Sequence, residues 1–113
     1  TAGSANRPLT TIAWLDSAKN IGRISEGGKV ELSYRFRNSG NNPLVITSVS
    51  PSCGCTVAEK PEEPVLPGEE GVIKASFNSH GRVGMNHKTL MVNANIPDAS
   101  YTLTFEVEVV KSE

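Results

Sequence analysis

Apolar and polar residues alternate along most of the chain, and the clearest run covers residues 30–37. Every second position there is apolar, whereas the positions between them are polar or charged. Residues 101–110 repeat the alternation, and shorter versions occur over residues 73–77 and 90–94. Because successive side chains of a β-strand point to opposite faces, this period of two predicts strands with one buried face. The inward-facing positions are Val30, Leu32, Tyr34, Phe36, Ile73, Ala75, Phe77, Leu90, Val92, Ala94, Tyr101, Leu103, Phe105, Val107 and Val109.

Three shorter apolar runs, over residues 11–15, 44–49 and 56–58, complete a set of about seven strands. Glycine, proline and asparagine residues separate the runs, as expected for turns. Helical spacing is absent over any useful length, and residues 16–20 are expected to form at most one helical turn, which Gly22 ends. The pattern predicts an all-β fold, an immunoglobulin-like antiparallel β-sandwich of about seven strands.

A length of 113 residues and a net charge of -1 are typical of one small domain. We expect the sandwich to cover residues 10–111, with Trp14, Tyr34 and Phe36 as its bulky core residues, and residues 1–9 to be a flexible N-terminal segment. The 11 Lys and Arg are balanced by 12 Asp and Glu, which argues against a basic nucleic-acid surface. No apolar run approaches the roughly 20 residues that a membrane-spanning helix needs.

Residues 59–67 contain three prolines and three glutamates, so this segment cannot pair as a central strand. We interpret it as an extended connection that shields a sheet edge, because proline and charge discourage strand addition. The sequence does not indicate which of the other edges is open.

An ordered set of motifs between residues 20 and 96 resembles a bacterial protein family. The motifs are Asn20–Gly27, Phe36–Gly40, Pro43–Ile46, Ser52–Thr56, Pro67–Gly71, Gly81–Gly84 and Val92–Asn95. Together they resemble the domain-of-unknown-function 1573 family, whose wider relatives are the immunoglobulin-like modules of ASPM, SPD-2 and Hydin and those of major sperm protein type. Ile21 stands where that family more often has an aromatic residue.

The resemblance implies an immunoglobulin-like sandwich in an extracytoplasmic protein, either periplasmic or at the cell surface or secreted. It also implies a signal peptide or lipoprotein leader on the precursor, and it implies no catalytic residue and no settled biochemical activity. The chain starts at Thr1 without a methionine, and we expect the polar stretch from Thr1 to Pro8 to be the remnant of a tether.

Cys53-Gly54-Cys55 is the motif best able to carry chemistry. Residues two apart in an extended strand have Cα atoms about 7 Å apart, at or beyond the usual disulfide limit of about 6.8 Å. Gly54 can bend the chain because glycine tolerates positive φ. A disulfide would close a very short loop, to which the chain-entropy model assigns about 1.6 kcal/mol.

Four interpretations of this pair stay open. The cysteines can be unreactive buried thiols, since free Cys packs as a small hydrophobe. They can form a local disulfide, either structural or redox-labile. They can bind copper(I) or zinc, which suit soft thiolate ligands. Finally, an exposed thiol can take part in covalent or intermolecular chemistry.

His80 and His87 are the residues that could complete a metal site with Cys53 and Cys55. Six residues separate the two histidines, more than the three to five of common zinc hairpins. Neither has an acidic neighbour in the local sequence, so we interpret both as solvated side chains and expect neither a metal nor a cofactor.

No nucleophile elbow, phosphate loop, zinc-protease helix or dinucleotide fingerprint occurs in the chain. The glutamates at positions 59, 62, 63, 69 and 70 lie on proline-rich or turn segments, which do not hold two carboxylates at the fixed separation of a glycosidase. We interpret Gly81–Gly84, which includes Arg82, as a tight hairpin connection between strands that end near Asn78 and start near Asn86. The chain is therefore expected not to be an enzyme.

The expected function is that of a monomeric, non-catalytic interaction or scaffolding module of the bacterial cell envelope. It would present loops and a strand edge to a protein partner, or act by strand addition, with no nucleic-acid partner and no membrane span beyond a possible lipid anchor on the precursor. The candidate binding residues are Ser52, Cys53, Gly54 and Cys55, together with Arg82. The alternative is a thiol-redox or copper- or zinc-binding protein that uses Cys53 and Cys55.

Overall fold

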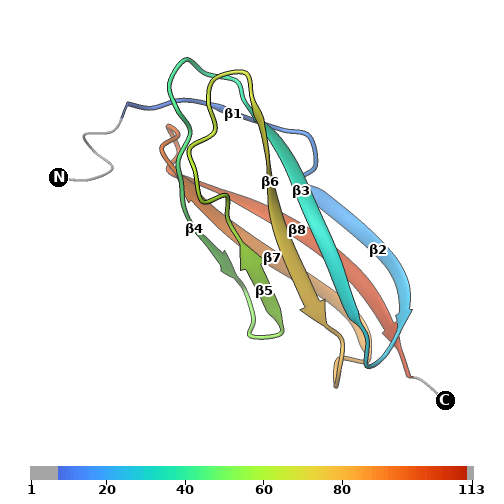
Figure 1. Cartoon of the computed structure of the whole chain (residues 1–113). Coiled ribbons are helices and arrows are strands. Elements are labelled where there is room, and N and C mark those ends of the chain that lie inside the picture. Colours follow the sequence, from blue (N-terminus) through green and yellow to red (C-terminus); the bar gives the residue numbers. More distant parts are fainter. Residues whose placement is uncertain (1–7, 112–113) are drawn as a thin grey trace.

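Eight β-strands and no helix make up residues 8–111, the part of the chain that the computed structural model describes (Figure 1). They are β1 (Ile12–Trp14), β2 (Ala18–Ser25), β3 (Lys29–Asn38), β4 (Ile46–Pro51), β5 (Thr56–Glu59), β6 (Glu70–Asn78), β7 (Gly84–Ala94) and β8 (Ser100–Val110). Two four-stranded sheets result, with the order β1-β3-β6-β5 in the first and β2-β8-β7-β4 in the second. The predicted all-β sandwich is confirmed, with eight strands in place of about seven.

The strand that the sequence did not predict is β2. The helical turn expected over residues 16–20 is wrong, because Ala18–Ser25 is extended and pairs with β8. This pair is parallel, whereas every other pair of strands in the two sheets is antiparallel. The register of β2 shifts between Asn20 and Arg23, around Gly22 with its φ of 89°. A bulge of this kind moves later side chains by one position and so hides the period of two.

The chain passes from the first sheet to the second at Asp16. The backbone N–H groups of Leu15 and Asp16 both donate to the carbonyl oxygen of Arg35, at 2.9 and 3.2 Å. The next carbonyl, that of Ser17, accepts a hydrogen bond of 3.0 Å from the N–H of Thr104 in β8. The Asp16 carboxylate meanwhile accepts the Arg35 backbone N–H at 3.2 Å and the Arg35 Nε–H at 2.9 Å. On the β1 side of β3, backbone pairing therefore stops at Arg35.

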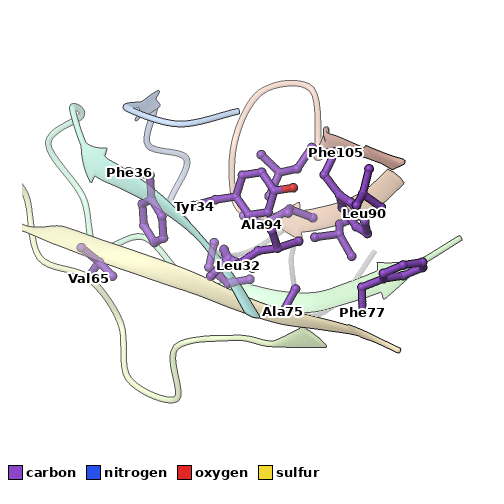
Figure 2. Packing of buried hydrophobic residues seen from close by; sticks show 14 of the residues in the cluster. Leu32, Tyr34, Phe36, Val65, Ala75, Phe77, Leu90, Ala94 and Phe105 are labelled. Atoms are coloured by element: carbon purple, nitrogen blue, oxygen red, sulfur yellow. The ribbon is translucent and has the colours of Figure 1, made fainter. Parts of the chain in front are cut away.

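The core lies between the sheets and uses most of the inward positions that the alternation predicts (Figure 2). Tyr34 and Phe36 of β3 are fully buried, and the rings of Phe77 and Phe105 meet edge to face with centroids 5.7 Å apart. One predicted core residue, Trp14 at the end of β1, is only half-buried. The inward assignment of Tyr101 is wrong, because its side chain is 39% exposed near the start of β8, where it stacks on Trp14 with ring centroids 5.1 Å apart.

A buried asparagine organises the end of the sandwich where β3 stops. The Asn38 side chain is fully buried and makes four hydrogen bonds. It donates to the carbonyl oxygens of Asn42 and Val65, and it accepts from the Thr10 hydroxyl and the Gly40 N–H. One side chain thus joins three separate stretches of chain to the end of β3.

Asn95 plays a similar part for the loop before β4. Its side chain accepts a hydrogen bond from the Val45 N–H and donates to the carbonyl oxygens of Pro8 and Pro43. Of the segment predicted to be flexible, residues 1–7 lie outside the described part of the chain. Pro8 and Leu9 are held by their carbonyl oxygens, the latter through the side chain of Asn42 at 2.9 Å.

The proline-rich segment 59–67 begins with Glu59, the last residue of β5, and contains one further paired residue, Val65. Val65 forms reciprocal backbone hydrogen bonds of 2.9 Å with Leu44, and both side chains are buried. The segment thereby connects β5 to β6 across the side of the sandwich where β4 and β5 contact each other.

Candidate functional site

The motif Cys53-Gly54-Cys55 lies in the turn between β4 and β5, which we call the cysteine turn (residues 52–56). The turn carries the chain from the second sheet to the first. Its ends are closed by a hydrogen bond of 3.3 Å from the Thr56 N–H to the Cys53 carbonyl oxygen. The Cα atoms of Cys53 and Cys55 are 5.3 Å apart, and their sulfurs form a disulfide. Because the chain turns here, the separation is shorter than the extended-strand value that the sequence reasoning assumed.

Hydrogen bonds anchor the cysteine turn to both sheets. The Ser52 N–H donates to the Thr89 carbonyl oxygen at 2.9 Å, and the Ser52 hydroxyl oxygen accepts the Thr89 N–H at 3.1 Å. On the other side, the Asn78 N–H donates to the Cys55 carbonyl oxygen at 2.9 Å. Thr89 belongs to β7 and Asn78 ends β6, so each sheet holds one end of the turn.

The two half-cystines differ in burial. Cys55 is 8% exposed and belongs to the hydrophobic core, whereas Cys53 is half-buried and packs against that core. The Cys55 N–H donates to the Cys53 sulfur at 3.2 Å. Gly54 is exposed, and a Cβ atom there would meet nothing within 4 Å. The positive φ expected at Gly54 is absent, so the bend does not depend on glycine's extra freedom.

Arg82 lies in the connection between β6 and β7, four residues beyond Asn78, at the same end of the sandwich as the cysteine turn (Figure 1). The predicted hairpin is wrong, because β6 and β7 belong to different sheets. The connection is fixed instead by buried Ser79, whose hydroxyl and N–H both donate to the Gly28 carbonyl oxygen, at 2.6 and 3.0 Å. The side chain of Arg82 is exposed, and its N–H donates to the Ser79 carbonyl oxygen at 3.1 Å.

Two other candidate polar residues, His87 and Glu70, form ion pairs. His87 pairs with Glu106 across the β7–β8 register at 2.8 Å, an acidic neighbour that the local sequence did not reveal. Of the candidate carboxylates, Glu70 pairs with Arg37 at 3.2 Å. Between residues 8 and 111, no group of three or more His, Cys, Asp or Glu side chains lies where it could hold a metal ion.

The ion pair between Asp16 and Arg35, where the chain passes from the first sheet to the second, lowers the pKa of the Asp16 carboxyl group. The hydrogen bonds from Arg35 lower the pKa of Asp16 to about 2, from an ordinary 3.8. Lys19 adds a third contact at 3.5 Å. This cluster fixes the departure of the chain from the first sheet and lies at the opposite lateral side from the cysteine turn.

A shallow depression beside the cysteine turn was missed by the sequence reasoning. It has a volume of about 370 Å³ and lies on the outer face of the first sheet, over β3, β5 and β6. Ser33, Lys74 and Glu59 are aligned across these three strands, and the small Ser33 and Ser76 leave room between longer neighbours. The depression arises from the register of three strands, which the pattern within any single strand does not contain.

Within the described residues there is no helix with the length and apolarity to cross a membrane. A comparison with curated protein sequences finds no match.

Solved structures show the same fold at low sequence identity. A protein of unknown function from Porphyromonas gingivalis W83 matches 96% of this chain, with a TM-score of 0.73 and 14% identity. The chain spans only half (50%) of the length of that protein. The ASH/PapD-like domain 7 of human CEP192 matches 100% of the chain and 92% of its own length, with a TM-score of 0.69 and 10% identity. The fold is therefore an immunoglobulin-like β-sandwich.

The sequence comparison identifies the family that the motifs between residues 20 and 96 resemble. The model for "Protein of unknown function (DUF1573)" matches residues 12–109, which includes all eight strands except the last residue of β8. The chain is a member of the DUF1573 family.

Proposed function

We propose that this chain is a non-catalytic protein-interaction module of the bacterial cell envelope, periplasmic or at the cell surface, and that it contacts its partner through the cysteine turn. The observation that carries the proposal is the combination of exposure and anchoring in that turn. Ser52 and Gly54 are exposed, while backbone hydrogen bonds to Thr89 and Asn78 and the disulfide hold their positions. A loop that is already fixed loses little conformational entropy on binding, which favours recognition.

Exposed apolar side chains around the same end of the sandwich support this proposal. Val57, one residue beyond the turn, is 64% exposed, and Val83 and Met85 near Arg82 are 55% and 63% exposed. Apolar groups on a surface contribute to association when a partner covers them. Arg82 adds a cation with the planar geometry suited to carboxylate groups.

The disulfide also supports an extracytoplasmic location. Disulfides persist in oxidising compartments such as the periplasm and are rare in the cytosol. Separation of periplasm from cytosol in the bacterium that encodes the chain tests the location, and recovery of the chain in the cytosol would refute that part of the proposal.

Photo-crosslinking from position 54 tests the binding site. Because a side chain at Gly54 meets no neighbour, a photoreactive phenylalanine there should leave the fold intact. Illumination of living cells is expected to give a cross-linked product from position 54. The matched control carries the same residue at exposed Glu62, on the proline-rich segment, and should give none. Equal products from both positions, or none from position 54, would contradict the proposal.

The alternative function in thiol or metal chemistry has no observation in its favour. Both sulfurs are joined in the disulfide, and Cys55 packs in the core. The double variant Cys53→Ser and Cys55→Ser separates the two cases. Loss of stability points to a structural bond, whereas an intact fold that loses thiol exchange or metal uptake would support the alternative.

A further inference from the structure

One half of β3 has a free edge. The backbone N–H and C=O groups of the even-numbered residues of β3 point towards β6. Two hydrogen bonds show this, one from the Asn38 N–H to the Glu69 carbonyl oxygen at the end of β3 and one from the Ser79 N–H to the Gly28 carbonyl oxygen just before its start. Backbone groups alternate in direction along a strand, so the odd-numbered residues point the other way. Arg35 and Arg37 face the segment that contains β1, and the backbone of residues 11–16 pairs only with residues 35–39 of this strand and its end.

The N–H and C=O groups of Lys29, Glu31 and Ser33 therefore point into a space that no strand within residues 8–111 fills. We call this space, beside residues 29–33, the vacant lane. It continues the line of β1 beyond Asp16, where the chain leaves for the second sheet. At about 3.4 Å per residue, the lane accommodates a strand of roughly five residues.

The vacant lane has an apolar inner wall. Since β4 and β5 contact each other at one side of the sandwich, β1 and β2 lie at the opposite side, and β2 faces the lane from the second sheet. Ile21 and Ile24 of β2 and Val30 of β3 are only partly buried there, although they pack against the core. Side chains of an added strand that point inward would cover these three residues.

The remaining edges are less suited to accept a strand. β1 has three residues and β5 has four, β4 ends at Pro51, and β2 is interrupted by its bulge. Short length, proline and bulges are the usual means by which proteins protect sheet edges. By contrast, residues 29–37 of β3 pair with β6 without any shift in register.

The position of β2 also limits what can enter the lane. A second copy that offered its own β3 would bring its β8 opposite that strand, into the space that β2 already occupies. A single extended segment, with no second layer of its own, meets no such obstacle. Lys29 and Glu31 are exposed and form no ion pair with any residue that the structure describes, so they remain available to such a segment.

Building on the interaction function proposed above, we propose that the vacant lane binds an extended segment of the partner protein by strand addition. The segment runs antiparallel to β3, with apolar residues opposite Val30 and Leu32. Between them it places a basic residue opposite Glu31, and beyond them an acidic residue opposite Lys29, where opposite charges on facing strands attract. A synthetic peptide with the core Thr-Val-Lys-Val-Glu satisfies this pattern.

Amide hydrogen exchange of the full chain, followed residue by residue by NMR, tests the proposal. In the free chain the amides of Val30, Leu32 and Tyr34 are expected to exchange slowly and those of Glu31 and Ser33 rapidly. With the peptide at ten times its dissociation constant, exchange at the two odd positions should slow by about tenfold, because only the unbound fraction exchanges. No change, or a change without this alternation, would overturn the proposal. Slow exchange of Glu31 and Ser33 in the free chain, with a dimeric mass in sedimentation, would also overturn it.

A charge exchange provides the matched control. The double variant Lys29→Glu and Glu31→Lys keeps the net charge and alters only exposed side chains. It should lose affinity for the original peptide and prefer the core Thr-Val-Glu-Val-Lys, and equal preference would contradict the proposed register. Crosslinking from Gly54 remains a separate measurement. If position 54 captures a partner while the peptide protects no amide, the strand-addition proposal fails and the interaction function stands.

Discussion

Replacement of Asn38 by alanine tests whether one buried side chain holds an end of the sandwich together. Asn38 Nδ2 donates to the carbonyl oxygens of Asn42 and Val65, each at 2.8 Å. Its Oδ1 accepts from the Thr10 hydroxyl at 2.7 Å and from the Gly40 N–H at 3.0 Å. Alanine removes all four bonds at once.

The expected loss of stability depends on whether each hydrogen-bond partner of Asn38 can find another partner in the variant. A hydrogen bond contributes about 1 kcal/mol net, and an unsatisfied buried partner costs about 1–3 kcal/mol. Gly40 and Asn42 are half-buried, so water can replace part of what they lose, whereas Thr10 is buried. Val65 keeps one partner, because its carbonyl oxygen also accepts the Leu44 N–H. Together these considerations predict that Asn38→Ala lowers the free energy of unfolding by about 3 kcal/mol, a large part of the 5–15 kcal/mol typical of a domain.

Urea denaturation followed by far-ultraviolet circular dichroism measures this change. With a slope of about 1.5 kcal/mol per molar urea, the midpoint should fall by about 2 M. Asn41→Ala is the matched control, since Asn41 is exposed in the same turn and its side chain has no hydrogen bond to a described residue. The control should stay within about 0.5 kcal/mol of the natural chain. If the two variants unfold at the same urea concentration, the buried network does not support the fold as argued.

Three further predictions concern single side chains. Burial raises the pKa of Tyr34 from 10.0 to about 12, so the contribution of the neutral phenol to the free energy of unfolding should be fully present below pH 10 and be lost as the pH rises through 12. Urea titrations of Tyr34→Phe should show a free energy of unfolding about 1 kcal/mol lower at neutral pH and no such alkaline dependence. Arg35 holds the pKa of Asp16 at about 2, so the ion pair should stabilise the fold fully above pH 3.8 and lose its effect as the pH falls towards 2. In Arg35→Gln, an NMR titration should find the pKa of Asp16 returned towards 3.8, and an unchanged pKa would exclude Arg35 as the cause. In Gly71→Ala the new Cβ would lie 2.6 Å from the buried Phe36 ring, so calorimetry should show a loss of about 1–3 kcal/mol, and an unaltered melting temperature would show that the ring moves freely.

The sequence predicts the buried faces of the strands well because those faces depend only on local alternation. Leu32, Tyr34 and Phe36 were assigned inward by period alone, and all three are buried. The same reasoning missed β2, where the bulge at Gly22 interrupts the period. Local pattern also could not show that β2 runs parallel to β8, because that pairing joins residues some 85 positions apart, such as Arg23 and Glu108.

The cysteine turn illustrates a different limit. Two cysteines separated by one residue allow a disulfide, free thiols or metal ligands, and the choice depends on whether the chain turns or stays extended. That choice is made by distant residues, since Thr89 and Asn78 hold the two ends of the turn. The sequence therefore indicated where chemistry or binding was most plausible, but the conformation of the turn follows from the two sheets.

The vacant lane follows from a step that no strand pattern records, the passage of the chain from one sheet to the other at Asp16. Had β1 continued beside β3, its backbone would have bonded to Ser33, Glu31 and Lys29, and β3 would have no unpaired backbone groups there. The crossover instead gives β2 to the second sheet, where Ile21 and Ile24 face the position that β1 leaves empty. Because β2 stays in the second sheet and the vacant lane lies opposite it in the first sheet, the domain can accept an added strand without unfolding any of its own strands. That property separates strand addition in this fold from exchange of an existing strand, which would first have to break the pairing of β1 with residues 36–38.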